Sequence, residues 1–318
     1  MTDKWLVGVD LGGTTTKIAF LSTYGEILHK WEIPTDKSDS GKHIIVHIAK
    51  SIDAKLEQLD VEKEQLIGIG MGAPGPVEMR RGIIYEAINL GWSENTPLKD
   101  LIEKETGLPA FIDNDANCAA LGEMWKGAGN GAKDLVCVTL GTGVGGGVIT
   151  KGEIVHGIRG AGGELGHITV VPEGGYSCNC GKTGCLETVA SATGVVRVAR
   201  EKLKSSTEAS VLRDLKAIGA KQVFDAARAG DSLALTIVDQ LAYYLGLSLA
   251  NLGNVVNPEK IVIGGGVSKA GKTLLVPVMN YFKRFAFPKV RTSTTIDIAT
   301  LENDAGVIGA AWLVKSAL

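Results

Sequence analysis

The chain has 318 residues, of which 45% are hydrophobic and 21% charged, with a formal net charge of −2. A chain of this length exceeds what one hydrophobic core usually supports, so two domains are expected. The near-neutral charge gives no general attraction to polyanions, which argues against a nucleic-acid groove.

The sequence also bears on the location of the protein. The first dozen residues run into a strand-like segment, without the basic stretch, apolar run and cleavage site of a secretory signal. Charged, Asn and Gly positions interrupt each apolar stretch before it could span a bilayer. We therefore expect a soluble, cytoplasmic protein with no membrane partner.

Strands and helices alternate along the first part of the chain. Tight turns near Gly12 and Gly25 indicate an antiparallel meander of three strands. Helical spacing of apolar residues and a following apolar run then indicate a helix and a buried strand. Asp113 or Asn114 is positioned to cap a later helix. The expected elements are three strands within 4–34, a helix over 44–59, a strand over 66–73, a helix over 97–106, a strand over 110–112 and a helix continuing toward residue 125.

The second part of the chain repeats the plan of the first. Segments 7–15 and 136–144 share an apolar strand, a polar residue at its end, Leu-Gly, a small-residue turn and a second strand, which predicts an internal duplication. The later elements expected are strands over 135–140 and 145–149, a helix over 233–254, a strand over 260–263 and a final helix over 305–318. The expected domains are a small α/β lobe of residues 1–115, completed by 303–318, and a large α/β lobe of residues 116–302.

Glycine is enriched, with 42 of 318 residues, and it clusters beside strands. Glycine permits close approach of the backbone to a ligand, which a phosphate site requires. One such turn alone is compatible with an ordinary hairpin, but three together favour a nucleotide site. Because the first turn leads to another strand, the dinucleotide fingerprint of a Rossmann oxidoreductase is disfavoured. The candidate nucleotide residues are Gly12, Gly13 and Thr14, then Gly141, Thr142 and Gly143, then Gly264, Gly265 and Gly266.

Two charged residues flank the first glycine turn. Asp10 at the strand end is a candidate to hold Mg2+ through a carboxylate and water. Lys17 is expected to add positive charge toward the phosphates. A nucleotide with Mg2+ is therefore the cofactor that this part of the sequence predicts.

Asp115 is the candidate general base. Phosphoryl transfer requires a base that receives the proton of the acceptor hydroxyl. Asp115 lies where a strand hands over to a helix, so its carboxylate is expected at the edge of a cleft between the lobes, ionised by the helix N-terminus. A purely structural interpretation, in which Asp113, Asn114 and Asp115 only cap that helix, stays open here.

Three of the five cysteines fall within eight residues. Cys178, Cys180 and Cys185, with His167, match a tetrahedral structural zinc site, and the turns at Gly181 and Gly184 allow the backbone to fold around the ion. Closed four-ligand coordination assigns zinc a role in shape and not in chemistry. A packing role without zinc is the alternative.

Two carboxylates flank the cysteine cluster. Glu164 precedes His167 by three residues, and Glu187 follows Cys185 by two. Sugar hydroxyls are recognised by carboxylates and amides, so Asn114, Glu164 and Glu187 are candidates to bind a sugar. The second nitrogen of a metal-bound His167 could also face a hydroxyl. Either glutamate could instead be a surface residue.

These motifs together resemble the ROK family of sugar kinases, and most closely its bacterial glucokinases, within the actin, Hsp70 and hexokinase ATPase superfamily. The resemblance covers nearly the whole chain, and the cysteine cluster is its most specific part. It rests on Asp10-Leu-Gly-Gly-Thr, Gly72-Ala-Pro-Gly-Pro76, Asn114-Asp115-Ala-Asn117, Leu140-Gly-Thr-Gly143, Glu164-Leu-Gly-His167, Cys178-x-Cys-Gly-x-x-Gly-Cys-Leu-Glu187 and Gly264-Gly-Gly-Val-Ser268.

The resemblance implies a two-lobed α/β ATPase fold with a duplicated ribonuclease H-like core, and ATP-dependent phosphorylation of glucose to glucose 6-phosphate. It implies that Asp115 is the base, that Asn114, Glu164, His167 and Glu187 bind glucose, and that homodimers form. The family also contains repressors with an N-terminal helix-turn-helix, which is not expected here because the first glycine turn follows Asp10. The alternatives are a kinase for N-acetylmannosamine, N-acetylglucosamine, fructose or allose, or a nonenzymatic sugar sensor.

Overall fold

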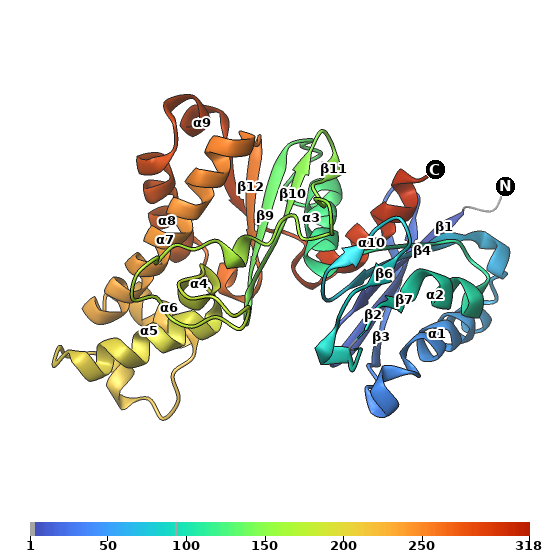
Figure 1. The fold of residues 1–318 in the computed structure, drawn as a ribbon, viewed down its shortest axis with the longest axis horizontal. Helices are drawn as coiled ribbons and strands as arrows, with labels where there is room; N and C mark the ends of the chain where they lie inside the picture. Colours follow the sequence, from blue (N-terminus) through green and yellow to red (C-terminus); the bar gives the residue numbers. More distant parts are fainter. Residues whose placement is uncertain (1–3, 93) are drawn as a thin grey trace. The chain divides into compact units, whose positions relative to one another are not determined.

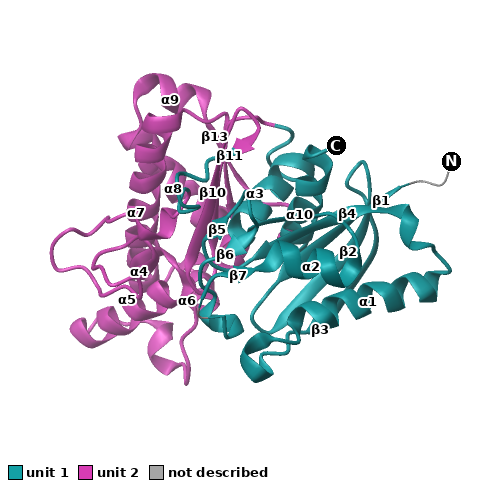
Figure 2. Ribbon diagram, turned by 45° about the vertical axis from the view of Figure 1, so that its right-hand side comes forward, with its two compact units in different colours: residues 1–131, 154–162, 303–318 teal, residues 132–153, 163–302 magenta. Residues whose placement is uncertain are grey.

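The computed structural model describes residues 4–92 and 94–318, which form two compact units (Figures 1 and 2). Unit 1 contains the described residues up to Gly131, together with Ile154–Gly162 and Asn303–Leu318. Unit 2 contains Ala132–Glu153 and Gly163–Glu302. Each unit is a mixed α/β structure around its own five-stranded sheet, so the predicted fold class is confirmed.

The sheet of unit 1 has the strand order β3-β2-β1-β4-β8. The predicted meander forms its antiparallel half, and β4 pairs in parallel with both β1 and β8. Its strands are β1 (Trp5–Leu11), β2 (Thr15–Ser22), β3 (Ile27–Pro34), β4 (Leu66–Ala73) and β8 (Ala110–Asn114). A small separate sheet, not anticipated from the sequence, contains β5 (Val77–Glu78), β6 (Ile83–Ile84) and β7 (Thr96–Pro97).

Helices lie on both faces of this sheet. Successive residues of a strand point to opposite faces, so each strand contributes side chains to both layers of packing. One face packs into a hydrophobic cluster with α1 (Ile44–Leu59) and α2 (Leu98–Thr106). The other face contacts α3 (Asp115–Lys126) and α10 (Ala305–Ser316).

The sheet of unit 2 repeats this topology with the order β11-β10-β9-β12-β13. The antiparallel hairpin of β9 and β10 corresponds to that of β1 and β2, and parallel β12 corresponds to β4. The internal duplication predicted from segments 7–15 and 136–144 is therefore confirmed. The strands are β9 (Leu135–Leu140), β10 (Val144–Thr150), β11 (Glu153–Ile154), β12 (Lys260–Gly264) and β13 (Thr295–Ile298).

Helices of unit 2 share one hydrophobic cluster with its sheet. They are α4 (Glu187–Ala190), α5 (Ala192–Ser205), α6 (Ala220–Arg228), α7 (Ser232–Val256), α8 (Lys272–Phe285) and α9 (Pro288–Ser293). By length and composition α7 could cross a membrane, yet 61% of its most apolar window is buried inside the structure. Its contacts with α5, α6 and α8 make it a core helix of unit 2.

The division into units differs from the expected boundary at residue 115. Residues 116–131 lie in unit 1 because α3 packs closely against α10 and also contacts β4. Residues 154–162 also lie in unit 1, although the chain on both sides of them belongs to unit 2. The final helix completes unit 1, as its apolar surface requires.

Three glycines allow α10 to approach its neighbours at backbone distance. A Cβ built on Gly8 or Gly70 of the sheet would lie 2.0 Å from the Val307 oxygen or 1.7 Å from the Ala310 oxygen. A Cβ on Gly309 of α10 would lie 1.6 Å from the carbonyl oxygen of Cys118 in α3. Larger residues at these positions would therefore force the backbones apart.

We expect Gly309→Ala to destabilise the protein by about 3 kcal/mol, because backbone atoms cannot rotate away from the added methyl group. Urea unfolding followed by circular dichroism measures the change. Gly266→Ala is the control, since its methyl group meets nothing within 4 Å and stability should be retained. Equal unfolding midpoints for Gly309→Ala and the unaltered protein would contradict the packing described.

Candidate active site

The first glycine turn connects β1 and β2, and Thr35 holds it from outside. The Thr35 hydroxyl donates to the Gly12 carbonyl oxygen at 2.7 Å, and the Thr35 N–H donates to the Thr14 oxygen at 2.9 Å. Both carbonyls are thus engaged, so an anion approaching the turn meets amide groups. Gly13 lies against Asn89, whose Nδ2 would be 3.4 Å from a Cβ at Gly13.

Asp10 and Lys17 form a cross-strand pair beside this turn. Lys17 Nζ lies 3.4 Å from Asp10 Oδ2, and the two residues are directly opposite in the β1–β2 register. Burial raises the pKa of Asp10 above its ordinary value, although the charge of Lys17 opposes this shift. A cation beside the carboxylate would favour its ionised form. Asp10 therefore fits the magnesium role predicted for it, and the first turn of α10 at Gly306 packs against it.

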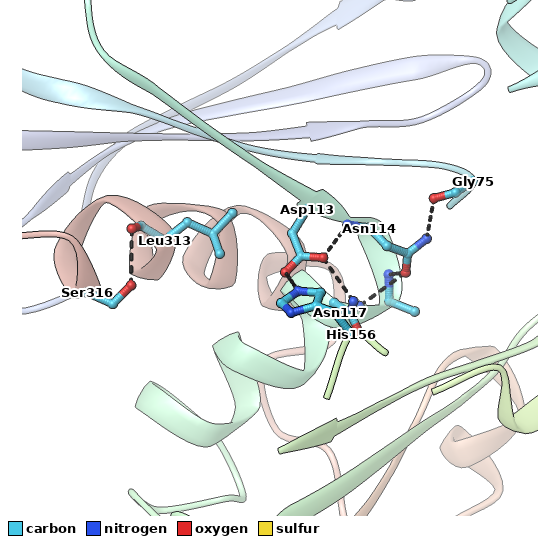
Figure 3. A network of polar contacts seen from close by, with 8 residues as sticks. Gly75, Asp113, Asn114, Asn117, His156, Leu313 and Ser316 are labelled. Carbon is cyan, nitrogen blue, oxygen red and sulfur yellow. Dashed lines mark hydrogen bonds and ion pairs between the residues drawn. The ribbon is translucent and has the colours of Figure 1, made fainter. Parts of the chain in front are cut away.

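The junction between β8 and α3 is built by hydrogen bonds from three consecutive residues, of which Figure 3 shows Asp113 and Asn114. Asn114 caps α3, because its Oδ1 accepts from the N–H groups of Ala116 at 2.9 Å and Asn117 at 3.3 Å. Its Nδ2 donates to the Gly75 carbonyl oxygen at 3.1 Å. Asp115 is the first helical residue, and its Oδ1 accepts from the Ala116 N–H at 2.8 Å. The helix N-terminus favours the ionised carboxylate of Asp115.

Asp113 is the buried member of this group, with 1% of its surface exposed. It accepts from the Asn114 N–H at 2.7 Å and from Asn117 Nδ2 at 2.9 Å, and it pairs with His156 Nε2 at 2.9 Å (Figure 3). With these partners Asp113 stabilises the junction itself. Its neighbour Asp115, which is partly exposed, is better placed to meet a ligand.

Asp10 and Asp115 lie at the same edge of the unit 1 sheet. Asp10 is in register with Gly72 on β4, and Gly72 is in register with Asp113 on β8. The thiol of Cys118 lies beneath this edge, and burial raises its pKa well above the ordinary value. The charges of Asp113, Asp10 and Asp115 add to that rise, so all three carboxylates lie near enough to act on this thiol.

The second and third glycine turns adjoin one another in unit 2. Gly264 is in register with Thr139, and a Cβ on Gly265 would lie 2.5 Å from the Leu140 oxygen. Helix α5 begins at the second turn, where the Ala192 N–H donates to the Gly141 oxygen at 2.8 Å. The Thr193 hydroxyl donates to the Thr142 oxygen at 2.8 Å.

A cavity of about 440 Å³ opens beside the third turn. Gly266 and Lys269 line one side, and Phe224 and Arg228 of α6 line another. An adjoining groove of about 690 Å³ is lined by Thr142 and by residues of α5. A cavity that combines apolar walls with charged side chains, next to the glycine turns of unit 2, suits a nucleoside whose phosphates reach those turns.

His167 and the three clustered cysteines can hold a tetrahedral metal ion. Their ligand atoms all lie within 4.8 Å of one another. Cys180 Sγ and Cys185 Sγ are 3.7 Å apart, close to the roughly 3.8 Å that two sulfurs at 2.3 Å from zinc require. His167 Nδ1 lies 3.5 Å from Cys178 Sγ, so Nδ1 is the nitrogen that faces the cluster. Gly184, with φ of +73°, lies so close to Val171 that a Cβ would be 1.8 Å from its oxygen.

The thiol of Cys185 is buried and lies close to the other two thiols of this cluster. Burial raises the pKa of Cys185 to about 12, and hydrogen bonds and charge from Cys180 and Cys178 add to the rise. A divalent cation reverses this balance, because it binds thiolates directly.

Glu187 and Glu164 contact different ligands of the cluster. Glu187 Oε2 accepts from the Val144 N–H at 3.0 Å, and its Oε1 lies 3.8 Å from Cys178 Sγ. Glu187 therefore connects the cysteine cluster to the second glycine turn. Glu164 Oε2 lies 3.8 Å from His167 Nε2, and half of its side chain is exposed. Close packing of Gly166 on the Val144 carbonyl holds this segment against β10.

The predicted site residues thus gather in two groups. Unit 1 brings together Asp10, the first turn, Asn114 and Asp115, and unit 2 brings together the other turns, both glutamates and the metal ligands. The structure adds contacts that sequence motifs did not indicate, namely Thr35, Asn89, His156, Thr193, Phe224, Arg228 and Lys269. These residues lie outside the glycine and cysteine motifs, so only folding shows where they belong.

Comparisons with known proteins cover nearly the whole chain. The model of the ROK family matches residues 6–317. The glucokinase of Halalkalibacterium halodurans is 59% identical over 318 residues, covering 99% of this chain and 96% of that protein. The glucokinase of Thermotoga maritima is 41% identical over 313 residues, covering 98% and 97%. The structure of a ROK family glucokinase from Streptomyces griseus in complex with glucose and AMPPNP is 36% identical, with a TM-score of 0.79 and coverage of 98% and 99%.

We expect the purified protein to carry one divalent metal ion per chain, as measured by elemental analysis. Cys185→Ser should weaken binding roughly 100-fold or more, since one of four ligands carries a share of the roughly 10–16 kcal/mol typical of such sites. Cys118→Ala is the control, because Cys118 lies in α3 of unit 1 and not in the cysteine cluster. The metal content of this variant should stay complete. Full metal content in Cys185→Ser would contradict this ligand set.

Proposed function

The chain belongs to the ROK family, and on this premise we propose that it is a glucokinase, transferring the terminal phosphoryl group of ATP to glucose with Asp115 as general base. It is a hexokinase-type phosphotransferase with the actin-like ATPase fold of its structural neighbours. The observation that carries the proposed role of Asp115 is its position at the same sheet edge as Asp10 and the first glycine turn.

Asp115 performs the proton transfer in this proposal. Its carboxylate accepts the proton of the glucose 6-hydroxyl while that oxygen forms a bond to the γ-phosphorus of ATP. The bond from phosphorus to the bridging oxygen breaks, and ADP leaves with the electron pair. The helix N-terminus at Asp115 keeps the carboxylate ionised, and its bond to the Ala116 N–H fixes its direction.

The glycine turns and the cavity of unit 2 bind ATP in this proposal. In unit 2, amides of the turn at 142–143 hold the phosphates and the cavity beside 264–266 holds the adenosine, since the Gly141 N–H already donates to the Gly143 oxygen. In unit 1, the turn at 13–14 offers further amides to phosphate. Asp10 would hold Mg2+, which when bound would neutralise phosphate charge. Lys17 adds a second positive charge at the same strand ends.

Glucose is held by groups that the fold orients in advance. Asn114 offers an amide fixed at both ends by its cap and its bond to Gly75. Glu164, His167 and Glu187 offer two carboxylates and an imidazole nitrogen, which together accept and donate hydrogen bonds to neighbouring hydroxyls.

The metal of the cysteine cluster is zinc in this proposal, with a structural role. Thiolate and imidazole ligands select zinc, and four protein ligands leave no open position for a reactant. The ion would fix the ring of His167 and, through Cys178, the position of Glu187. A homodimer, which family membership implies, and a cytoplasmic location complete the proposal.

We expect Asp115→Asn to lower kcat by about 100- to 10,000-fold, because the positioned base is lost. The dissociation constant of glucose, measured by calorimetry, should change by less than about threefold, since Asp115 is assigned to the proton and not to sugar recognition. ADP release in a coupled assay with glucose and a panel of other sugars tests the activity of the unaltered protein. Normal turnover in folded Asp115→Asn would reject its assignment as the base. A preference of the unaltered protein for an N-acetylated sugar would reject glucose as the substrate.

Gly143 provides a matched test of Glu187. A Cβ at Gly143 would lie 2.2 Å from Glu187 Oε2, and the flexible carboxylate can move away without unfolding the protein. Gly143→Ala should therefore raise the KM for glucose by about tenfold or more through loss of an oriented hydrogen bond. Gly141→Ala, in the same turn, places its methyl group 4.0 Å from the Gly143 oxygen and should not raise this KM. The same glucose KM in both variants would contradict the sugar-binding role of Glu187.

A further inference from the structure

The segment 154–162 is a part of unit 1 that the chain supplies from the middle of unit 2. It closes on itself through the Gly162 N–H, which donates to the His156 carbonyl oxygen at 2.8 Å. It packs on the small sheet at Gly160, where a Cβ would lie 2.1 Å from the Val77 oxygen. The segment therefore has a defined backbone path, and that path presents the side chain of His156 to Asp113.

His156 completes the hydrogen bonding of a buried carboxylate. Asp113 is 1% exposed, and a buried carboxylate is costly unless its lone pairs are engaged. Oδ1 is engaged by the Asn114 N–H and by Asn117 Nδ2, both from the β8–α3 junction. Oδ2 is engaged by His156 Nε2 at 2.9 Å, which comes from outside that junction (Figure 3).

Asp113 is hydrogen-bonded directly to residues that follow it in the chain. Its Oδ1 holds the backbone N–H of Asn114, and Asn117 Nδ2 contacts the same oxygen. Asn114 in turn caps α3 and contacts Gly75, and Asp115 begins the helix. A rotation of the Asp113 carboxylate would therefore change the start of α3, where the proposed sugar amide and the proposed base both lie.

We propose that His156 is a positioning residue for the kinase reaction, which through Asp113 fixes the directions of Asn114 and Asp115. The inference rests on the proposed function, since it assigns His156 a role toward that same site. His156 contacts neither substrate nor reacting atoms in this assignment. Its imidazole is 27% exposed at the side chain, so it lies at the margin of the buried network.

The test compares three substitutions that differ in which hydrogen bond they retain. His156→Ala removes the contact with Asp113. His156→Gln places an amide N–H near the position of Nε2 and can donate to the carboxylate. His156→Asn is shorter, so its amide reaches only the position of Nδ1 and should fail to restore the contact. Gln and Asn thus form a matched pair of equal polarity.

Steady-state kinetics should separate the variants. We expect His156→Ala and His156→Asn to lose about 10- to 100-fold in kcat/KM for glucose, because displacements near 1 Å at a reacting group have effects of this size. His156→Gln should stay within about threefold of the unaltered protein, and the KM for ATP should change by less than about threefold in all three. Equal activity of Asn and Gln variants, or a parallel loss of ATP affinity, would overturn the proposal.

Amide hydrogen exchange provides a readout that needs no activity. Exchange of the Asn114, Ala116 and Asn117 amides should accelerate in His156→Ala and His156→Asn and return to the original rate in His156→Gln. Unchanged exchange in His156→Ala would overturn the positioning role even if the protein were active. An unaltered protein that phosphorylates none of the sugars tested would reject the proposed function separately, while the exchange result would still decide whether His156 orders the junction.

Discussion

Parallel pairing of β4 with β1 on one side and β8 on the other aligns Asp10, Gly72 and Asp113 at one edge of the unit 1 sheet. Neighbouring strands are about 4.8 Å apart, so the backbones of Asp10 and Asp113 are separated by about 10 Å. That spacing would leave room for a phosphoryl group and a hydroxyl between Asp10 and Asp115, which follows Asp113 by two residues. A shift of one residue in either register would turn one of these carboxylates to the opposite face.

Unit 2 uses the same topology for a different purpose. The end of β9 carries Thr139 where β1 carries Asp10, so the second glycine turn lacks a carboxylate at this place. Glu187 instead approaches the turn from α4 and accepts from the Val144 N–H. Because Glu187 also lies next to Cys178, a metal in the cysteine cluster would stabilise the turn and the sugar ligands together. The duplicated hairpin is thus connected through Glu187 to the cysteine cluster.

Local signals in the sequence were sufficient for the motifs and for many of the elements, but the small sheet of unit 1, α5, α6 and β13 were not anticipated. Apolar periodicity predicted α1 and β4, and the capping pattern predicted a helix starting after Asp113 or Asn114, of which Asn114 is the cap. Spacing of Cys178, Cys180 and Cys185 predicted a cluster that the fold assembles with His167. The boundary at 131 could not be predicted in this way, because the placement of α3 depends on its packing against a helix from the far end of the chain.

Contacts between distant segments account for the remaining differences. His156 is 43 positions from Asp113, and nothing around either residue indicates the other. Thr35 and Asn89 likewise reach the first glycine turn from separate parts of the chain. Their roles depend on loop paths, which local propensity does not determine. The roles assigned to Asp115, Asn114, Glu164 and Glu187 remain predictions whose geometry is now defined.

The position of α10 at the end of the chain has a consequence for synthesis on the ribosome. Its backbone covers Gly8 at Val307 and Gly70 at Ala310, so these glycines are made 299 and 240 residues earlier. Until the last helix emerges, one face of the first sheet lacks its cover and exposes apolar surface to water. Unit 2 is complete before that moment, since it ends at Glu302. Unit 1 should therefore be the later of the two to complete its packing.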